Sequence, residues 1–282
     1  MPLPCFGRRI ALLTTLFMPV GLCGLASPAS ANDCALTLGG NPQMLRGHPY
    51  VSMTSEVVKI DVYDQEVDVD CNFTFTNHGP ACTVLMGFPD QGEGEADPDE
   101  EADPAELRNK PPRTALESFD SYVNGKPVKT RFIRTRPDGL CWHTKTVIFP
   151  ARSTVHVRDV YTQEVGSGVA SYNDGKSGGG CNQVAYILHT GASWHGGIGR
   201  SEIDVIFHTK AISVPLRPFP VSSICDDEDN DGRNLKVTSV APNTIVWRGP
   251  CPPTVQGRTL RFVRSNWHPT DDDILLTYHY TK

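Results

Sequence analysis

The feature that most constrains the fold is the alternation of apolar and polar residues along several segments. In residues 55–76 one parity is apolar and the other polar, and Asp64-Gln65 interrupts the pattern. Side chains on one face of a β-strand recur every two residues, so the segment predicts two strands, each with one buried and one solvated face. The apolar side chains are Val58, Ile60, Val62, Val67, Val69, Cys71, Phe73 and Phe75.

Further short segments of this kind follow, separated by turns that contain glycine or proline. Asn124-Gly125 predicts a hairpin, because both central residues of a type I′ turn need a positive φ. No stretch has a convincing helical stripe, and at most 105–109 or 114–119 forms a short helical turn. The pattern therefore predicts an all-β protein with very little helix, an antiparallel β-sandwich built as one large or two consecutive sandwich domains. The further strands are expected at 82–88, 141–149, 154–165, 184–188, 202–207, 235–240, 244–247, 259–263 and 274–280.

Residues 1–31 are typical of a signal peptide. Arg8 and Arg9 form a basic region, an apolar stretch follows from Ile10, and Ala29-Ser30-Ala31 gives the small-residue pattern of a cleavage site. We expect cleavage before Asn32 and export to the periplasm or the extracellular space. No later segment is apolar for long enough to cross a membrane, so we expect no membrane span after cleavage.

The rest of the chain is predicted to contain two β-rich regions, residues 32–165 and 166–282. The segment 92–112 in the first region is expected to be an exposed, disordered loop, because its like charges repel and it has little apolar surface to bury. Its acids are Glu93, Glu95, Asp97, Asp99, Glu100, Glu101, Asp103 and Glu106. The Gly/Ser-rich segment 166–180 is expected to be a mobile loop. The formal net charge of −6 argues against binding to nucleic acid or anionic lipid.

Seven cysteines lie outside the leader, and none has a CxxC or zinc-finger spacing. In an oxidising compartment they are expected to form disulfides, with one cysteine left over. We predict Cys225–Cys251, at the base of a hairpin spanning residues 235–247, and less strongly Cys141–Cys181.

One short segment resembles a calcium-binding loop. Asp227, Asp229 and Asp231 alternate and are followed by Gly232, as in the first half of an EF-hand loop. Position 12 of that loop is Thr238 in place of an acid, and no flanking helices are expected. A polar turn is therefore the favoured interpretation, with calcium as the alternative, and no other cofactor is expected.

The sequence indicates no coherent catalytic set. Ser193 and His195 lie close together, but a nucleophile elbow would need glycine at position 195 and a strand-to-helix turn. The histidines are scattered and are interpreted as surface residues. Core packing is favoured over sugar stacking for the four tryptophans, which are Trp142, Trp194, Trp247 and Trp267.

Several short motifs are found along the chain: Met53-Thr54-Ser55-Glu56, Phe73-Thr74-Phe75-Thr76-Asn77, Gly87-Phe88-Pro89, Ile148-Phe149-Pro150-Ala151, Val160-Tyr161, and Tyr186 to Trp194 with Gly197-Ile198-Gly199. Together they resemble a family of exported bacterial proteins, domain of unknown function 4424. The similarity covers roughly residues 32–207 and implies export and a β fold, without catalytic residues. The segment 119–128 with Phe88-Pro89 is more distantly similar to the VIT domain, an all-β module of extracellular proteins.

These observations predict an exported, non-catalytic β-sandwich protein that binds an envelope or extracellular protein or a glycan through its surface and loops. Two alternatives stay open. One is a secreted hydrolase or sugar-active enzyme built from dispersed Asp, His and Trp residues, and the other is a calcium-stabilised extracellular module.

Overall fold

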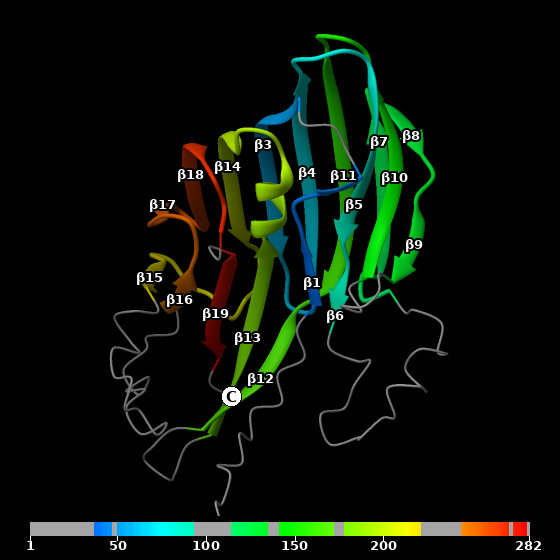
Figure 1. Ribbon diagram of the computed structural model, residues 1–282. Helices are drawn as coiled ribbons and strands as arrows, with labels where there is room; N and C mark the ends of the chain where they lie inside the picture. Colours follow the sequence, from blue (N-terminus) through cyan, green and yellow to red (C-terminus); the bar gives the residue numbers. More distant parts are fainter. Residues whose placement is uncertain are drawn as a thin grey trace, which may run out of the picture. The chain divides into compact units, whose positions relative to one another are not determined.

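The computed structural model describes residues 37–46, 50–92, 114–134, 141–171, 178–220, 244–270 and 273–280, and the part of the chain from Asn32 to Lys282 forms one compact unit. Nearly all of its regular structure is β-strand (Figure 1). A single 3₁₀ helix, η1 (His189–Ser193), is found within these ranges. The predicted all-β class is confirmed.

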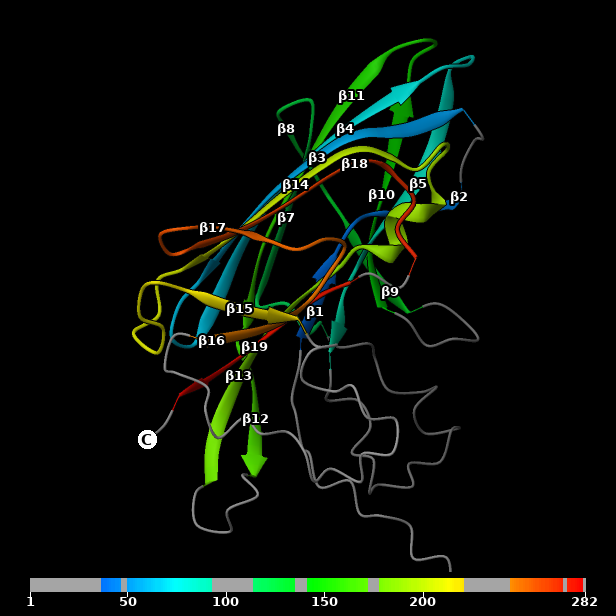
Figure 2. The same cartoon turned by 90° about the vertical axis from the view of Figure 1, so that its left-hand side faces the viewer.

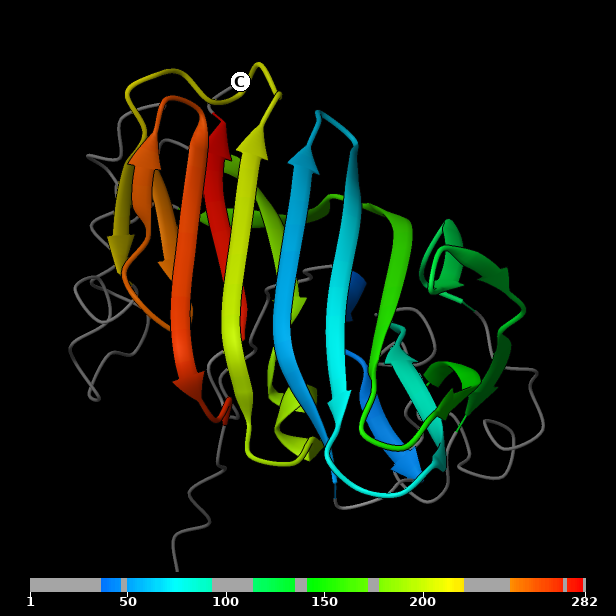
Figure 3. The same ribbon diagram turned by 90° about the horizontal axis from the view of Figure 1, so that it is seen from above.

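The largest sheet has eight strands, and Figure 3 looks onto it, with β3 in blue and β4 in cyan near its centre. Most neighbours are antiparallel, but β14 runs parallel to β3. In sheet order the strands are β17 (Thr254–Gln256), β18 (Thr259–Trp267), β14 (Ile198–Phe207), β3 (Val51–Val62), β4 (Glu66–Asn77), β11 (Thr154–Glu164), β7 (Ser118–Val123) and β8 (Lys126–Val128).

Two smaller sheets face this one. The seven-stranded sheet has the order β15 (Arg217–Pro220), β16 (Thr244–Arg248), β19 (Ile274–Tyr280), β13 (Gly178–Ile187), β1 (Thr37–Gly40) and β6 (Gln91–Gly92), and β12 (Gly166–Ser171) also pairs with β13. The four-stranded sheet has the order β2 (Gln43–Arg46), β5 (Cys82–Pro89), β10 (Cys141–Phe149) and β9 (Arg131–Arg134). Figure 2 shows the two layers from the side.

The core lies between the layers, where apolar side chains from all three sheets form one contiguous cluster. The alternation in β3 and β4 explains this directly, because one face of each strand is buried and the other is partly or fully exposed. All four tryptophans are buried, at 2–9% relative exposure, and Trp194, Trp247 and Trp267 belong to this cluster, so the predicted role in core packing is confirmed for these three.

The expected strands agree closely with the structure wherever it describes them. The Asn124-Gly125 hairpin is confirmed, with φ angles of 50° and 76° at the two residues. The expectation of a loop across 166–180 is wrong in part, because β12 and the start of β13 pair as a hairpin there. No helical turn forms at 114–119, where β7 begins at Ser118.

Strands from both sides of residue 165 share the eight-stranded sheet, since β14 and β18 come later in the chain than β3, β4 and β11.

The leader 1–31 and the expected strand 235–240 lie outside the described residues, as does the acidic segment from residue 93 onward. Within the described ranges, no helix has the length and apolar composition needed to cross a membrane.

Candidate functional site

The second layer is interrupted at two buried polar residues. β1 pairs with β6 and β2 pairs with β5, so segments 37–46 and 82–92 form one antiparallel pair with a break in its middle. Asn41 lies in the break on the first segment and Asp90 on the second. Their relative exposures are 0% and 2%, so both side chains need hydrogen-bond partners inside the protein.

Both oxygens of the Asp90 carboxylate have hydrogen-bond partners. One oxygen accepts from the backbone N–H of Ala115 at 2.8 Å. The other accepts from the Thr114 hydroxyl at 2.6 Å and lies 2.8 Å from Nε2 of His143. Asp90 precedes the segment 93–113 in the chain and Thr114 follows it, so this carboxylate joins described residues from the two sides of that segment.

The His143 ring contacts two phenylalanines. Its centroid lies 4.3 Å from that of Phe119 in a stacked arrangement and 5.1 Å from that of Phe132 in a tilted one. Both phenylalanines are half-buried, and 12% of the His143 side chain is exposed. These rings therefore lie where the core reaches the surface, at the edge strand β9.

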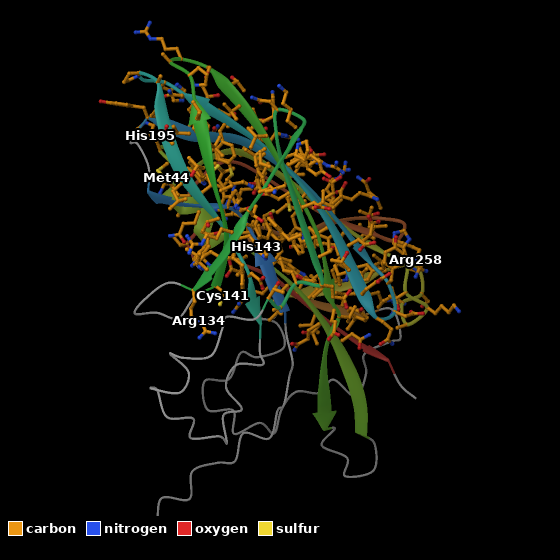
Figure 4. The ribbon with its side chains drawn as sticks, turned by 90° about the vertical axis from the view of Figure 1, so that its right-hand side faces the viewer. Met44, Arg134, Cys141, His143, His195 and Arg258 are labelled. Atoms are coloured by element: carbon orange, nitrogen blue, oxygen red, sulfur yellow. The ribbon has the colours of Figure 1, made fainter. Side chains whose placement is uncertain are left out.

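We call Asp90, Phe119, Phe132, Arg134 and His143 the β9–β10 edge. Phe132 pairs with His143 and Arg134 with Cys141 across the two strands. Residues two apart on a strand point to the same side, so Arg134 shares a face with Phe132. Figure 4 shows Arg134, Cys141 and His143 close to one another, away from Arg258.

A buried ion pair lies behind this edge. Nζ of Lys145 contacts Oδ1 of Asp159 and donates to the Ser121 hydroxyl at 2.8 Å, and that hydroxyl donates to Oδ1 of Asp159 at 2.6 Å. The side chains of Lys145 and Asp159 are 2% and 0% exposed. Burial lowers the pKa of Lys145 because it penalises the ammonium form, and the nearby Asp159 opposes this effect. The pair links β10 in one layer to β11 in the other.

A second polar cluster surrounds Asn41. The Tyr186 hydroxyl donates to Oδ1 of Asn41 at 2.9 Å, and Nδ2 of Asn41 donates to the Leu188 carbonyl at 3.4 Å. Nε1 of Trp194 donates to the carbonyl of Pro42 at 2.8 Å. The motif from Tyr186 to Trp194 thus fixes the break in the second layer.

Glu56 is fully buried beside this cluster. A β-bulge between Met53 and Ser55 shifts the register of β3, so that Glu56 shares the core face of Val58. Desolvation raises its pKa to about 7, and Ser201 and Asn41 oppose the shift. Among the described residues, neither carboxyl oxygen has a partner in hydrogen-bonding geometry.

The structure does not bring Ser193 and His195 together as a catalytic pair. The Ser193 hydroxyl accepts from the backbone N–H of Met44 at 2.9 Å and donates to the Thr190 carbonyl at 2.9 Å. The His195 ring is exposed and lies 6.5 Å from that of His78.

Sequence reasoning missed three histidine–aspartate pairs: His143–Asp90, His189–Asp273 and His208–Asp61, with nitrogen–oxygen distances of 2.7–2.8 Å. Their partners are far apart in sequence, so spacing alone carried no signal.

The predicted calcium and disulfide residues are only partly described. Asp227, Asp229 and Asp231 lie outside the described residues, and so do Cys225 and the side chain of Cys181. The Cys251 sulfur lies 3.5 Å from the Val263 carbonyl, and Cys141 is buried in β10. Both disulfides therefore stay predictions. Among the described side chains, no three His, Cys, Asp or Glu groups converge on a metal site.

These features define an all-β sandwich protein with polar side chains between its layers and aromatic rings at one edge. The chain is similar to a candidate nutrient-binding protein from Legionella pneumophila, with 21% identity and a TM-score of 0.60 over 87% of this chain and 72% of that one. At this identity the similarity supports the fold alone.

Two weaker structural similarities carry no argument. Yeast LTA4 hydrolase gives a TM-score of 0.39 at 7% identity, over 83% of this chain and 29% of that one. The M1 zinc metallopeptidase from Deinococcus radiodurans gives 0.35 at 12% identity, over 84% and 43%. No protein-family model matches the chain, and no curated protein matches its sequence.

Proposed function

We propose that the protein is an exported, non-catalytic binding protein of the cell envelope or extracellular space, and that it binds a carbohydrate at the β9–β10 edge. The observation that carries this proposal is the His143 ring between Phe119 and Phe132 at a half-buried edge. Aromatic rings beside a few fixed polar groups are the usual composition of a small-molecule site.

The arrangement suits a sugar for two reasons. Half-buried phenylalanine rings can pack against the apolar face of a sugar, while a histidine held by a carboxylate forms hydrogen bonds with its hydroxyl groups. Asp90 is itself fixed by Thr114 and Ala115, so the histidine is positioned before a ligand arrives. Such preorganisation reduces the entropy lost on binding.

Three further observations support the proposal. The leader at residues 1–31 is typical of exported proteins, and the motifs between Met53 and Gly199 resemble an exported family, domain of unknown function 4424. The fold is similar to that of a protein described as a candidate nutrient-binding protein.

The test is a binding screen on the mature chain, by thermal shift and then calorimetry, against monosaccharides, oligosaccharides, amino acids and organic acids. We expect a sugar to stabilise the wild-type protein and to lose affinity at least tenfold in Phe132→Ala. His156→Ala changes an exposed histidine on the opposite face of the large sheet and is the matched control.

Binding of amino acids or organic acids in place of sugars would show that the ligand class is wrong. Sugar binding that survives both Phe132→Ala and His143→Ala would show that the site is wrong. Hydrolysis of a glycoside or ester by the wild-type protein would favour the alternative, a secreted hydrolase.

Calcium binding at Asp227, Asp229 and Asp231 is a separate proposal, which rests on their spacing alone. Comparing the melting temperature in calcium with that in EDTA tests it, and an unchanged value would remove these residues from consideration.

A further inference from the structure

The side chains of Lys145 and Asp159 are in contact inside the core, in positions from which they could react with each other. The amine is on β10 and the carboxylate on β11, in opposite layers, and neither side chain is more than 2% exposed. Oδ1 of Asp159 is the atom that Nζ contacts, so the carboxyl carbon lies only one bond further away. Oδ2 is buried and has no hydrogen-bond partner among the described residues.

We propose that Lys145 and Asp159 react to form an intramolecular amide bond, which joins the two layers of the sandwich covalently. Neither the binding activity proposed above nor the fold requires this bond, so it is an independent property of the chain.

The reaction needs no co-reactant from outside. The Lys145 ammonium first transfers a proton to the carboxylate, which gives a neutral amine and a neutral acid. Nζ then attacks the carboxyl carbon, and a carbon–nitrogen bond forms as a carbon–oxygen bond breaks. The departing hydroxyl takes a second proton from nitrogen and leaves as water, so the product is one amide and one water molecule.

The surroundings favour each step. Burial lowers the pKa of Lys145 and so makes the nucleophilic amine accessible. Holding the two groups in contact makes the attack effectively unimolecular. The Ser121 hydroxyl donates to Oδ1 of Asp159 and accepts from Nζ, so it can stabilise the charge that develops on oxygen and relay the proton.

The product is also better suited to the site than the ion pair. Two opposite charges enclosed in a protein core retain a large desolvation cost, and a neutral amide removes both charges. Ser121 keeps an acceptor after the reaction, because the amide oxygen takes the place of the carboxylate oxygen.

The test is the mass of the purified, reduced and denatured mature chain, followed by peptide mapping. We expect a mass lower than that of the sequence by one water, and a branched peptide that contains both Lys145 and Asp159. A full sequence mass would overturn the proposal. A mass deficit with Lys145 and Asp159 recovered only in separate linear peptides would overturn it as well, because an internal dehydration elsewhere would then be responsible.

Three variants sharpen the result. Lys145→Arg preserves the positive charge but removes the nucleophilic amine, so its mass should equal its sequence. Asp159→Asn should still react, with ammonia as the leaving group, and give a cross-linked product of the same mass as cross-linked wild type. Ser121→Ala should slow the formation of the bond after synthesis, so that a larger share of the freshly expressed variant has its full sequence mass. If Lys145→Arg fails to fold, the branched peptide of the wild-type chain decides the question alone.

Discussion

Nε2 of His143 lies 2.8 Å from a carboxylate oxygen of Asp90, and these two residues join strand β10 to the point where the second layer is interrupted. The same carboxylate holds Thr114 and Ala115. One buried group therefore fixes the histidine of the proposed binding edge and also links the chain just before β6 to the start of the segment at Thr114.

The first prediction concerns this carboxylate. Asp90→Asn keeps the size of the side chain but replaces one of its acceptor oxygens with a donor, so part of the network is left unsatisfied. We expect a loss of about 1–3 kcal/mol in the free energy of unfolding. Chemical denaturation measures it, and Asp120→Asn, at an exposed position of β7, is the control. Equal stability of the two variants would show that the Asp90 network contributes little.

The second prediction concerns the pair between the layers. Lys145→Met alone leaves Asp159 buried without its counter-charge, a cost of about 3–5 kcal/mol relative to an intact ion pair. The double variant Lys145→Met, Asp159→Leu removes both polar groups and should be more stable than this single variant. Neither variant can form the amide proposed above, so the comparison between the two measures the buried charge alone. Chemical denaturation measures both, and a double variant no more stable than Lys145→Met would contradict the prediction.

The third prediction is a pH dependence that originates at Glu56. Its pKa is raised from 4.5 to about 7 in the folded protein, so the folded state binds a proton more tightly than the unfolded chain. Protonated Glu56 therefore contributes its full stabilisation to the folded state below about pH 4.5. This contribution is lost as the pH rises from there through about 7. The shift corresponds to about 3 kcal/mol.

Glu56→Gln should remove this dependence, because its amide stays neutral. Denaturation curves from about pH 5 to about pH 8.5 should show a smaller decline for the variant than for the wild type. Glu164→Gln, at an exposed position of β11, should leave the slope unchanged. Parallel profiles for wild type and Glu56→Gln would mean that Glu56 titrates normally.

The fourth prediction concerns the β7–β8 hairpin. Asn124 has a φ of 50°, and its side-chain oxygen accepts from the backbone N–H of His156 at 2.9 Å. Asn124→Ala should cost about 1–2 kcal/mol, since it removes this bond and places alanine in the left-handed region. Lys126→Ala, at an exposed position next to the turn, should change stability by less than about 0.5 kcal/mol.

Local patterns predicted the strands well but not the partners of each strand. The alternation in residues 55–76 and the Asn124-Gly125 dipeptide are short-range signals, and both correspond to the structure. The turn at Asn77 differs: β4 belongs to the eight-stranded sheet and β5 to the four-stranded one, so the chain changes layer there. The Asn77 side chain fixes this crossing through the carbonyls of Pro80 and Pro150, a contact between distant segments.

The polar groups of the core were harder to predict than the strands. A bulge at Met53–Ser55 places Glu56 on the buried face, and a one-residue shift of this kind leaves no clear mark in the sequence. Lys145 has the same parity as the buried Val147 and Phe149, but its partner Asp159 is on a strand in the opposite layer, and no local pattern indicated their contact. Only the packing of the two layers brings the ion pair together, whereas Asp90 and His143 meet through the antiparallel pairing of β5 with β10.

The parallel pairing of β3 with β14 also determines when the protein can fold. β3 lies next to β4 in the chain, but its other neighbour is complete only at Phe207. During synthesis the first strands therefore remain with an unpaired edge until most of the polypeptide has emerged. Long-range pairing of this kind slows folding, and we expect the nascent chain to stay open to chaperones until its C-terminal strands are available.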